Sequence, residues 1–230
     1  MAIHILDFIA LAYMLVLWTG YSMYAKSRAQ KAQQKSLSHS MRMHRERWVR
    51  QMLLRDIRVT DASLLANQER VVGFFASATL IILAAVFTAL SSSNLIAEVA
   101  NQLPMAQVQT TEQVQMKFFA VALVLVYAFF MITWSLRQYG FVAVMMGGAP
   151  VPNESITEPE KERFILAMAR LMDTAGHDNN KGLRAYYFCL AMLFWIIHPY
   201  LYMLMSTVTI LVLASREFNS KAVHSLESSL

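Results

Sequence analysis

The stretch from residue 182 to residue 203 carries side chains that could do chemistry in a mostly apolar setting. Arg184 and two tyrosines come first, and an apolar run follows with His198-Pro199 in its middle. Pro199 lacks a backbone N–H, so it frees the carbonyl four residues earlier and can kink a helix. The His198 imidazole could bind a metal, accept a proton or line a pathway. We expect a packing histidine beside a kink, with a pathway as the alternative.

A second candidate site is a group of polar residues at the ends of predicted membrane helices. The planar guanidinium of arginine binds phosphate oxygens in pairs, and tyrosine favours the headgroup layer of a membrane. Three such helix ends meeting at the cytoplasmic interface would form a pocket for a phosphate or lipid headgroup. Alternatively, the arginines only anchor the helix ends. The residues of this predicted headgroup site are Asn67, Arg70, Arg137, Arg184, Tyr186 and Tyr187.

The elements that must position these residues are long apolar runs. The 230 residues are 57% hydrophobic and 15% charged, whereas a soluble domain has roughly a quarter charged residues. A helix of about 20 apolar residues crosses a hydrocarbon core of about 30 Å and satisfies its own backbone. The runs of that length are Ile5–Tyr24, Val71–Leu90, Phe118–Leu136 and Ala185–Ala214. They predict an all-α integral membrane four-helix bundle, with one domain over residues 1–216 and a polar tail over 217–230.

The charges between the runs predict the orientation of the bundle. Loop 25–70 holds eleven Lys and Arg, loop 137–185 holds six, and loop 91–115 holds none. Because basic loops stay in the cytoplasm, loops 25–70 and 137–185 are expected there. Loop 91–115 and both termini are then expected outside. The formal net charge of +5 is a topology signal on this interpretation, and no nucleic-acid partner is expected.

Amphipathic helices are predicted within both basic loops. In loop 25–70, Met41, Trp48, Met52 and Leu53 share one face of a helix whose other faces carry arginines. That helix could lie on anionic lipid, dock on a partner, or present a solvated positive face. Thr60-Asp61 is expected to cap the helix that enters the second run.

The helix of the second basic loop has a clear start signal. Thr157 and Glu160 have the spacing of a capping box, in which each side chain satisfies an orphan amide of the other residue. An apolar stripe follows and is expected to end at Gly176. Its members are Phe164, Ile165, Met168, Leu171, Met172 and Ala175. We expect packing, rather than a soft-metal site at its two methionines.

Enzymatic chemistry has little support in the sequence. The chain has neither the Gly-x-Ser-x-Gly motif of serine hydrolases nor the His-Glu-x-x-His motif of zinc proteases. The single cysteine, Cys189, lies inside the fourth run and excludes an intrachain disulfide framework. The sequence therefore favours a protein that is not an enzyme and has no cofactor or metal. Gly73 and Ser77, four residues apart, predict a face for helix packing.

Four stretches carry a family resemblance. They are LDFIALAYMLVLWTGYSMY (6–24), LLANQERVVGFFASATL (64–80), WSLRQYGFVAVMMG (134–147) and GLRAYYFCLAMLFWIIHP (182–199). They resemble successive motifs of the domain of unknown function 599 family, over the chain up to about Arg216. The resemblance implies a four-span protein of the bacterial inner (cytoplasmic) membrane and no particular activity. The residues of the predicted headgroup site, and His198, lie within these motifs.

Two functions of different classes follow from these observations. The first is non-enzymatic binding of an anionic lipid headgroup, or of a partner, at the cytoplasmic face. The alternative is a homo-oligomeric channel or transporter in which the fourth span lines the pathway past His198-Pro199. Membrane lipids, and possible copies of the same chain, are the expected partners.

Overall fold

The computed structural model of the chain describes residues 5–30, 36–104 and 106–229. Within those residues, all regular secondary structure is helical, which confirms the predicted all-α class. The elements are α1 (Ile5–Gln30), α2 (Leu37–Leu53), α3 (Val59–Ser91), α4 (Ser93–Asn101), α5 (Thr111–Gly147), α6 (Glu158–Leu193), the 3-10 turn η1 (Phe194–Ile196), α7 (Pro199–Phe218) and α8 (Lys221–Glu227).

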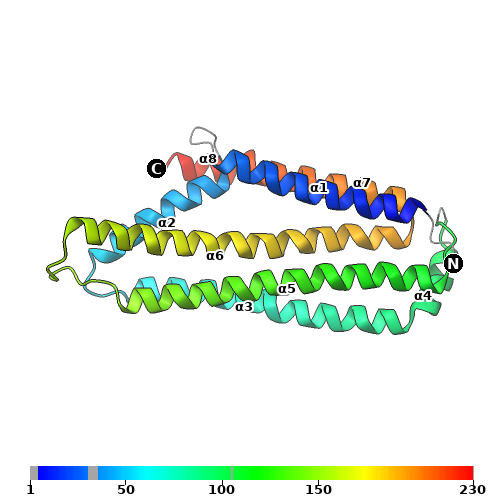
Figure 1. Cartoon of the computed structure of the whole chain (residues 1–230), viewed down its shortest axis with the longest axis horizontal. Coiled ribbons are helices and arrows are strands. Elements are labelled where there is room, and N and C mark those ends of the chain that lie inside the picture. The colour runs from blue at the N-terminus through cyan, green and yellow to red at the C-terminus, as the bar shows by residue number, and fades with distance from the viewer. Residues whose placement is uncertain (1–4, 31–35, 105, 230) are drawn as a thin grey trace.

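The helices form an elongated bundle in layers (Figure 1). α1 and α7 lie together, α6 and then α5 follow, and α3 covers the far side of α5. The start of α1, α4 and the α6–α7 turn lie at one end, which we call the neutral end. α2, α8 and the loop between α5 and α6 lie at the opposite end, which we call the basic end. The names reflect the sequence, because Lys117 is the only Lys or Arg between Arg70 and Arg137.

Among the residues that the structure describes, four helical segments are long and apolar enough to cross a membrane. The segments are Ile5–Ala25, Val59–Ser91, Thr111–Gly147 and Pro199–Glu227. The first three contain the apolar runs predicted from the sequence. The protein is therefore a helical membrane protein, as expected.

The fourth apolar run, Ala185–Ala214, is not one kinked helix. α6 ends at Leu193, and α7 begins at Pro199 and runs back along α6. Side-chain contacts fix this antiparallel arrangement: Arg184 lies 3.8 Å from Glu217, near one end of the pair. At the other end, the rings of Trp195 and Tyr202 stack with centroids 5.0 Å apart. The predicted kink is thus a chain reversal.

Proline chemistry explains the reversal as well as it explains a kink. Pro199 is the first residue of α7, where its missing N–H is not needed and its fixed φ suits a helix. His198 is extended, with φ −157° and ψ 137°, as the residue before a proline prefers. The start of α1 and the end of α8 consequently lie at opposite ends of the bundle. This differs from the expectation that both termini share one side.

The bundle has two apolar cores along its length. Near the neutral end, α1, α5, α6 and α7 bury a cluster that includes Met14, Leu125 and Phe188. Toward the basic end, α2, α3, α5 and α6 bury a second cluster that includes Met52 and Met168. The predicted stripe of α6 belongs to this second cluster, which confirms packing as its role. The capping box of Thr157 and Glu160 is also confirmed.

α6 is twice as long as its predicted cytoplasmic part because Gly176 does not end it. Gly176 lies inside α6, and an added Cβ would lie 2.5 Å from the Nη2 atom of Arg45. The glycine therefore makes room for an arginine of α2. Farther along, Gly182 faces α5, where an added Cβ would lie 3.2 Å from the Ala128 carbonyl oxygen.

α2 packs on the protein itself rather than lying free. Its Val49, Met52 and Leu53 are buried in the second core. Arg45 pairs with Asp173 at 2.7 Å, and Arg50 pairs with Glu162 at 2.6 Å, both acids being in α6. The hydrogen bond from Arg50 lowers the pKa of Glu162 below its ordinary value.

The predicted cap at Thr60-Asp61 is wrong. α3 already begins at Val59, and no side chain caps its first turn. Asp61 is instead buried and accepts hydrogen bonds from Trp48 at 2.6 Å and Arg55 at 2.5 Å. Because these donors lie before α3, the acid fastens the end of α2 to the start of α3.

Candidate functional site

The three arginines of the predicted headgroup site do not meet in one pocket. Arg70 and Arg137 are exposed, and the Arg137 guanidinium lies over the ring of Phe141 on its own helix. Gln138 donates to Asp178 at 2.7 Å, so Arg137 is level with that part of α6. Arg184 is six residues farther along α6, about 9 Å away along the helix axis. Arg184 lies inside a helix, whereas the sequence interpretation put it at a helix end.

The tyrosines and asparagine of that site also separate. The Tyr186 hydroxyl donates to the Phe75 carbonyl at 2.9 Å and thus joins α6 to α3. Tyr187 turns to α7, where its hydroxyl accepts a hydrogen bond from Arg216. Asn67 is exposed and lines a small cavity of about 220 Å³ between α2 and α3.

His198 has a structural role at the α6–α7 turn. Its Nδ1 accepts a hydrogen bond from the Tyr200 N–H at 3.2 Å and so caps α7. The imidazole also stacks on the Tyr200 ring, with centroids 5.3 Å apart. Neither contact gives the residue a partner at which chemistry could occur.

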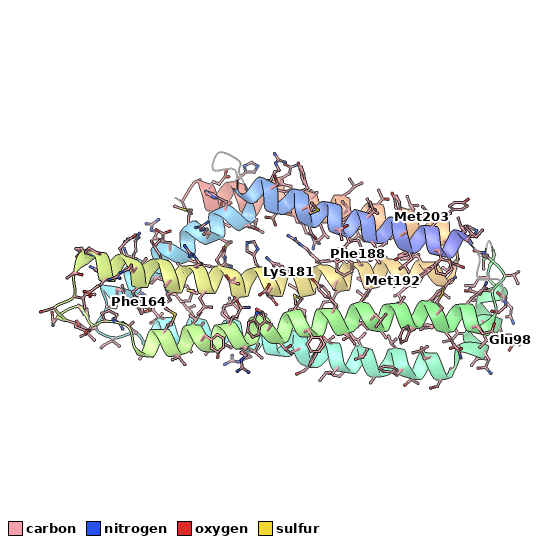
Figure 2. All side chains as sticks on the ribbon, viewed as in Figure 1. Glu98, Phe164, Lys181, Phe188, Met192 and Met203 are labelled. Atoms are coloured by element: carbon pink, nitrogen blue, oxygen red, sulfur yellow. The ribbon has the colours of Figure 1, made fainter. Side chains whose placement is uncertain are left out.

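A larger cavity lies toward the basic end, between α6 and the pair α1 and α2. Its volume is about 920 Å³. Lys181 lies where α6 and α2 stand apart (Figure 2). The lining residues are Trp18, Ser22, Met23 and Ala25 of α1; Ser38, His39 and Arg42 of α2; Tyr127 of α5; Asp173, Thr174, His177, Asp178, Lys181 and Arg184 of α6; and Glu217 of α7.

Charged side chains gather on the α6 wall of this cavity. Asp173, His177, Lys181 and Arg184 follow one another at intervals of three or four residues, which places them on one face of the helix. Lys181 pairs with Asp178 at 2.7 Å. The sequence interpretation missed this face because it placed α6 and the fourth run in separate elements.

α2 and α7 close the cavity through a carboxylate. Glu217 accepts hydrogen bonds from the Ser38 N–H at 3.2 Å and from the Ser38 hydroxyl at 2.5 Å. Its second oxygen lies 3.8 Å from Arg184. The guanidinium of Arg184 also lies 5.2 Å from the ring centroid of Tyr21, a cation–π contact. These contacts hold the Arg184 guanidinium at the cavity wall.

The opposite part of the cavity is aromatic. Trp18 stacks on Phe188 with ring centroids 4.8 Å apart, and its edge meets Tyr127 at 5.5 Å. Trp18 and Tyr127 line the cavity directly. The cavity therefore offers cationic groups and an apolar surface to the same ligand.

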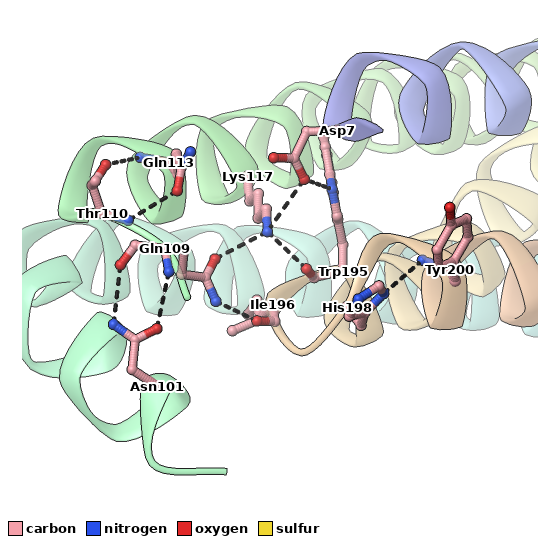
Figure 3. A network of polar contacts seen from close by, with 10 residues as sticks. All are labelled: Asp7, Asn101, Gln109, Thr110, Gln113, Lys117, Trp195, Ile196, His198 and Tyr200. Atoms are coloured by element: carbon pink, nitrogen blue, oxygen red, sulfur yellow. Dashed lines mark hydrogen bonds and ion pairs between the residues drawn. The ribbon is translucent and has the colours of Figure 1, made fainter. Parts of the chain in front are cut away.

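A second polar cluster is buried at the neutral end (Figure 3). The Lys117 ammonium lies 3.4 Å from Asp7 and donates to the Gln109 side chain at 3.0 Å and the Trp195 carbonyl at 2.9 Å. The Trp195 indole N–H donates to Asp7 at 2.7 Å. Both charged side chains are almost fully buried, at 3% and 2% exposure. The sequence marks both residues, because Asp7 is the only acid in the first apolar run and Lys117 is the only basic residue between Arg70 and Arg137.

Apolar side chains fill the bundle between this cluster and the cavity. Met14, Phe188, Met192 and Tyr202 are fully or almost fully buried there. This packing separates the buried cluster from the cavity within one chain. Within the described part of the chain, no three His, Cys, Asp or Glu side chains come together to hold a metal ion.

The fold and the cavity define a class, namely helical membrane proteins with a charged cavity toward one end of the bundle. Residues 9–222 match the family described as protein of unknown function, DUF599. The chain belongs to the DUF599 family, which confirms the resemblance of the four sequence stretches. No curated protein and no solved structure matches the chain.

Proposed function

We propose that the protein is a non-enzymatic membrane protein that binds an anionic phospholipid headgroup in the cavity of about 920 Å³. The observation that carries the proposal is the pairing of cationic and aromatic linings in one cavity. Arg184 and Lys181 supply donors for phosphate oxygens. Trp18 and Tyr127 supply an apolar surface for the first carbons of an acyl chain.

The proposal places the basic end in the cytoplasm of a bacterial inner membrane. The positive-inside rule supports this, because nearly all Lys and Arg lie before residue 71 or after residue 136. The reversal between α6 and α7 then requires the second half of α6 to cross with the four apolar segments. The start of α1 would face outward, and α8 would lie in the cytoplasm.

The depth of the cavity agrees with a lipid ligand. The apolar segment of α1 has 21 residues, Ile5–Ala25, which span about 31 Å and match a hydrocarbon core. Trp18 lies seven residues before the end of that segment, about 10 Å below the interface. The cavity would therefore reach from the headgroups to the upper acyl chains of the cytoplasmic leaflet.

Two double variants test the proposal by removing equal charge from different places. Lys181→Gln/Arg184→Gln removes two cations from the cavity, and Arg70→Gln/Arg137→Gln removes two exposed cations outside it. We expect phosphatidylglycerol to stay bound to wild type and to the control double in native mass spectrometry. We expect the cavity double to lose it.

Thermal shift with added phosphatidylglycerol gives a second measurement on the same variants. Ligand binding raises the melting temperature only while the site exists. A cavity double that is stabilised by this lipid as strongly as wild type would refute the proposed site. If the Arg70→Gln/Arg137→Gln control loses the lipid instead, the lipid binds at the arginines of the helix ends and not in the cavity.

A further inference from the structure

The cations around the cavity differ in whether an acid already pairs with them. Lys181 is paired with Asp178, and Arg184 lies beside Glu217. Arg45, behind the wall, is paired with Asp173. An anionic ligand that approaches these groups must share each of them with a carboxylate.

Arg42 is different. Its side chain is exposed in the cavity, and it forms no hydrogen bond or ion pair with the residues that the structure describes. It lies one helical turn after Ser38, which contacts Glu217, and three residues before Arg45, which contacts Asp173. The helical spacing therefore places Arg42 on the face of α2 that looks across the cavity to α6.

Counting the charged side chains around the cavity leaves one more positive than negative charge, and Arg42 carries it. Arg42, Arg45, Lys181 and Arg184 carry four positive charges, and Asp173, Asp178 and Glu217 carry three negative ones. The three acids lie beside Arg45, Lys181 and Arg184, so Arg42 carries the one positive charge of this set that has no carboxylate partner. A ligand with one negative charge neutralises it, whereas a dianion or a zwitterion brings a further charge for which the site has no free partner.

We propose, on the basis of the function proposed above, that Arg42 selects a lipid with a singly charged phosphodiester headgroup. The phosphodiester lies between Arg42 and the α6 wall, with its acyl chain toward Trp18. Phosphatidylglycerol has this charge. Phosphatidic acid, a phosphomonoester, carries more charge, and phosphatidylethanolamine is a zwitterion.

The test compares those three lipids on the full chain in a neutral detergent. We expect wild type to retain phosphatidylglycerol over phosphatidic acid and phosphatidylethanolamine in competition by native mass spectrometry. Arg42→Gln should weaken phosphatidylglycerol binding about tenfold, as expected for one lost charge-assisted contact. Arg47→Gln is the matched control, since Arg47 is an exposed arginine of the same helix outside the cavity lining.

The outcomes separate this inference from the proposed function. If Arg42→Gln binds phosphatidylglycerol as wild type does while Lys181→Gln/Arg184→Gln loses it, the inference fails and the proposed function stands. If wild type retains none of the three lipids, both fail. Equal retention of all three lipids also overturns the inference, because a charge-selecting site must discriminate among them.

A soluble competitor distinguishes a lipid from a free headgroup. Glycerophosphoglycerol carries the same phosphodiester without acyl chains. We expect it to leave bound phosphatidylglycerol in place at equal concentration, because it cannot use the aromatic part of the cavity. Displacement at equal concentration would overturn the assignment to a membrane lipid.

Discussion

The N–H of Tyr200 is one of the donors at the start of α7 that the helix itself cannot satisfy. Nδ1 of His198 accepts from it at 3.2 Å, so the imidazole does the work of a capping residue. This contact occupies the lone pair of Nδ1, so that nitrogen is not available to a metal or a proton relay. The capping of α7 therefore explains why a histidine stands directly before Pro199.

Replacing the cap tests this account. His198→Ala should lower the free energy of unfolding by about 1 kcal/mol, the usual cost of losing an N-cap acceptor. His198→Asn should recover most of that loss, because the amide oxygen can accept from the same N–H. Thermal unfolding in detergent measures both variants. An Asn variant no more stable than the Ala variant would show that packing on Tyr200, rather than the cap, carries the contribution.

At the scale of elements, the contact between α5 and α6 depends on the absence of a side chain at Gly182. An added Cβ would overlap the Ile132 side chain and lie 3.2 Å from the Ala128 carbonyl oxygen. The isoleucine can adjust, but a backbone oxygen inside a helix cannot move without shifting α5. The same glycine begins the stretch 182–199, one of the four that carry the family resemblance.

Gly182→Ala should therefore be destabilising despite the higher helix propensity of alanine. We expect a loss of about 1–3 kcal/mol, the usual cost of overpacking a core. Gly140→Ala is the control, because Gly140 lies within α5 and an added Cβ there meets nothing within 4 Å. The control should be neutral or more stable by up to about 1 kcal/mol. Equal melting temperatures for the two variants would contradict the close approach of α5 and α6.

The sequence predicted elements well where the signal was local. The capping box at Thr157, the stripe of α6 and three of the four apolar runs appear as expected. The fourth run failed because a proline can kink a helix or start one, and composition cannot decide between these outcomes. The docking of α2 also depends on distant partners, since Arg45 and Asp173 are 128 residues apart. No periodicity within either segment encodes that pairing.

At the scale of the whole molecule, the candidate site could not be predicted because five helices build it. Its Trp18, Arg42, Tyr127, Lys181 and Glu217 each come from a different helix. Of the site residues predicted from the sequence, only Arg184 lines this cavity. The reversal between α6 and α7 decides the rest, because it brings Glu217 back to Arg184.

At the neutral end, the buried Lys117–Asp7 ion pair joins α1 to α5 and, through Trp195, to the α6–α7 turn. Lys117→Met should destabilise the protein by about 3–5 kcal/mol, because it leaves the Asp7 carboxylate buried without its counter-charge. Asp7→Asn should also destabilise the protein, because it leaves the Lys117 ammonium buried without its counter-charge. The double variant should lose less than the sum of the two single losses, since neither charge is then buried alone. Lys221→Met, at an exposed lysine, is the control for charge removal.

Thermal unfolding in one detergent compares wild type, the two single variants, the double variant and the Lys221→Met control. Additive losses would mean that the two charges contribute independently, and the ion pair would then not be what fastens α1 to α5.

The chain reversal makes the position of the C-terminal end the sharpest test of the whole bundle. One continuous fourth span would place α8 on the same side of the membrane as the start of α1. Antiparallel α6 and α7 place it with Arg216 and Lys221 at the basic end. Because basic segments stay in the cytoplasm, a fluorescent-protein fusion after residue 230 should fluoresce and an alkaline phosphatase fusion there should be inactive.

Fusions after residue 103 and after residue 155 serve as controls, with the phosphatase active at the first and inactive at the second. If the phosphatase is active after residue 230 while both controls behave as expected, α6 and α7 do not both cross the membrane, and the cavity between them is not at lipid depth.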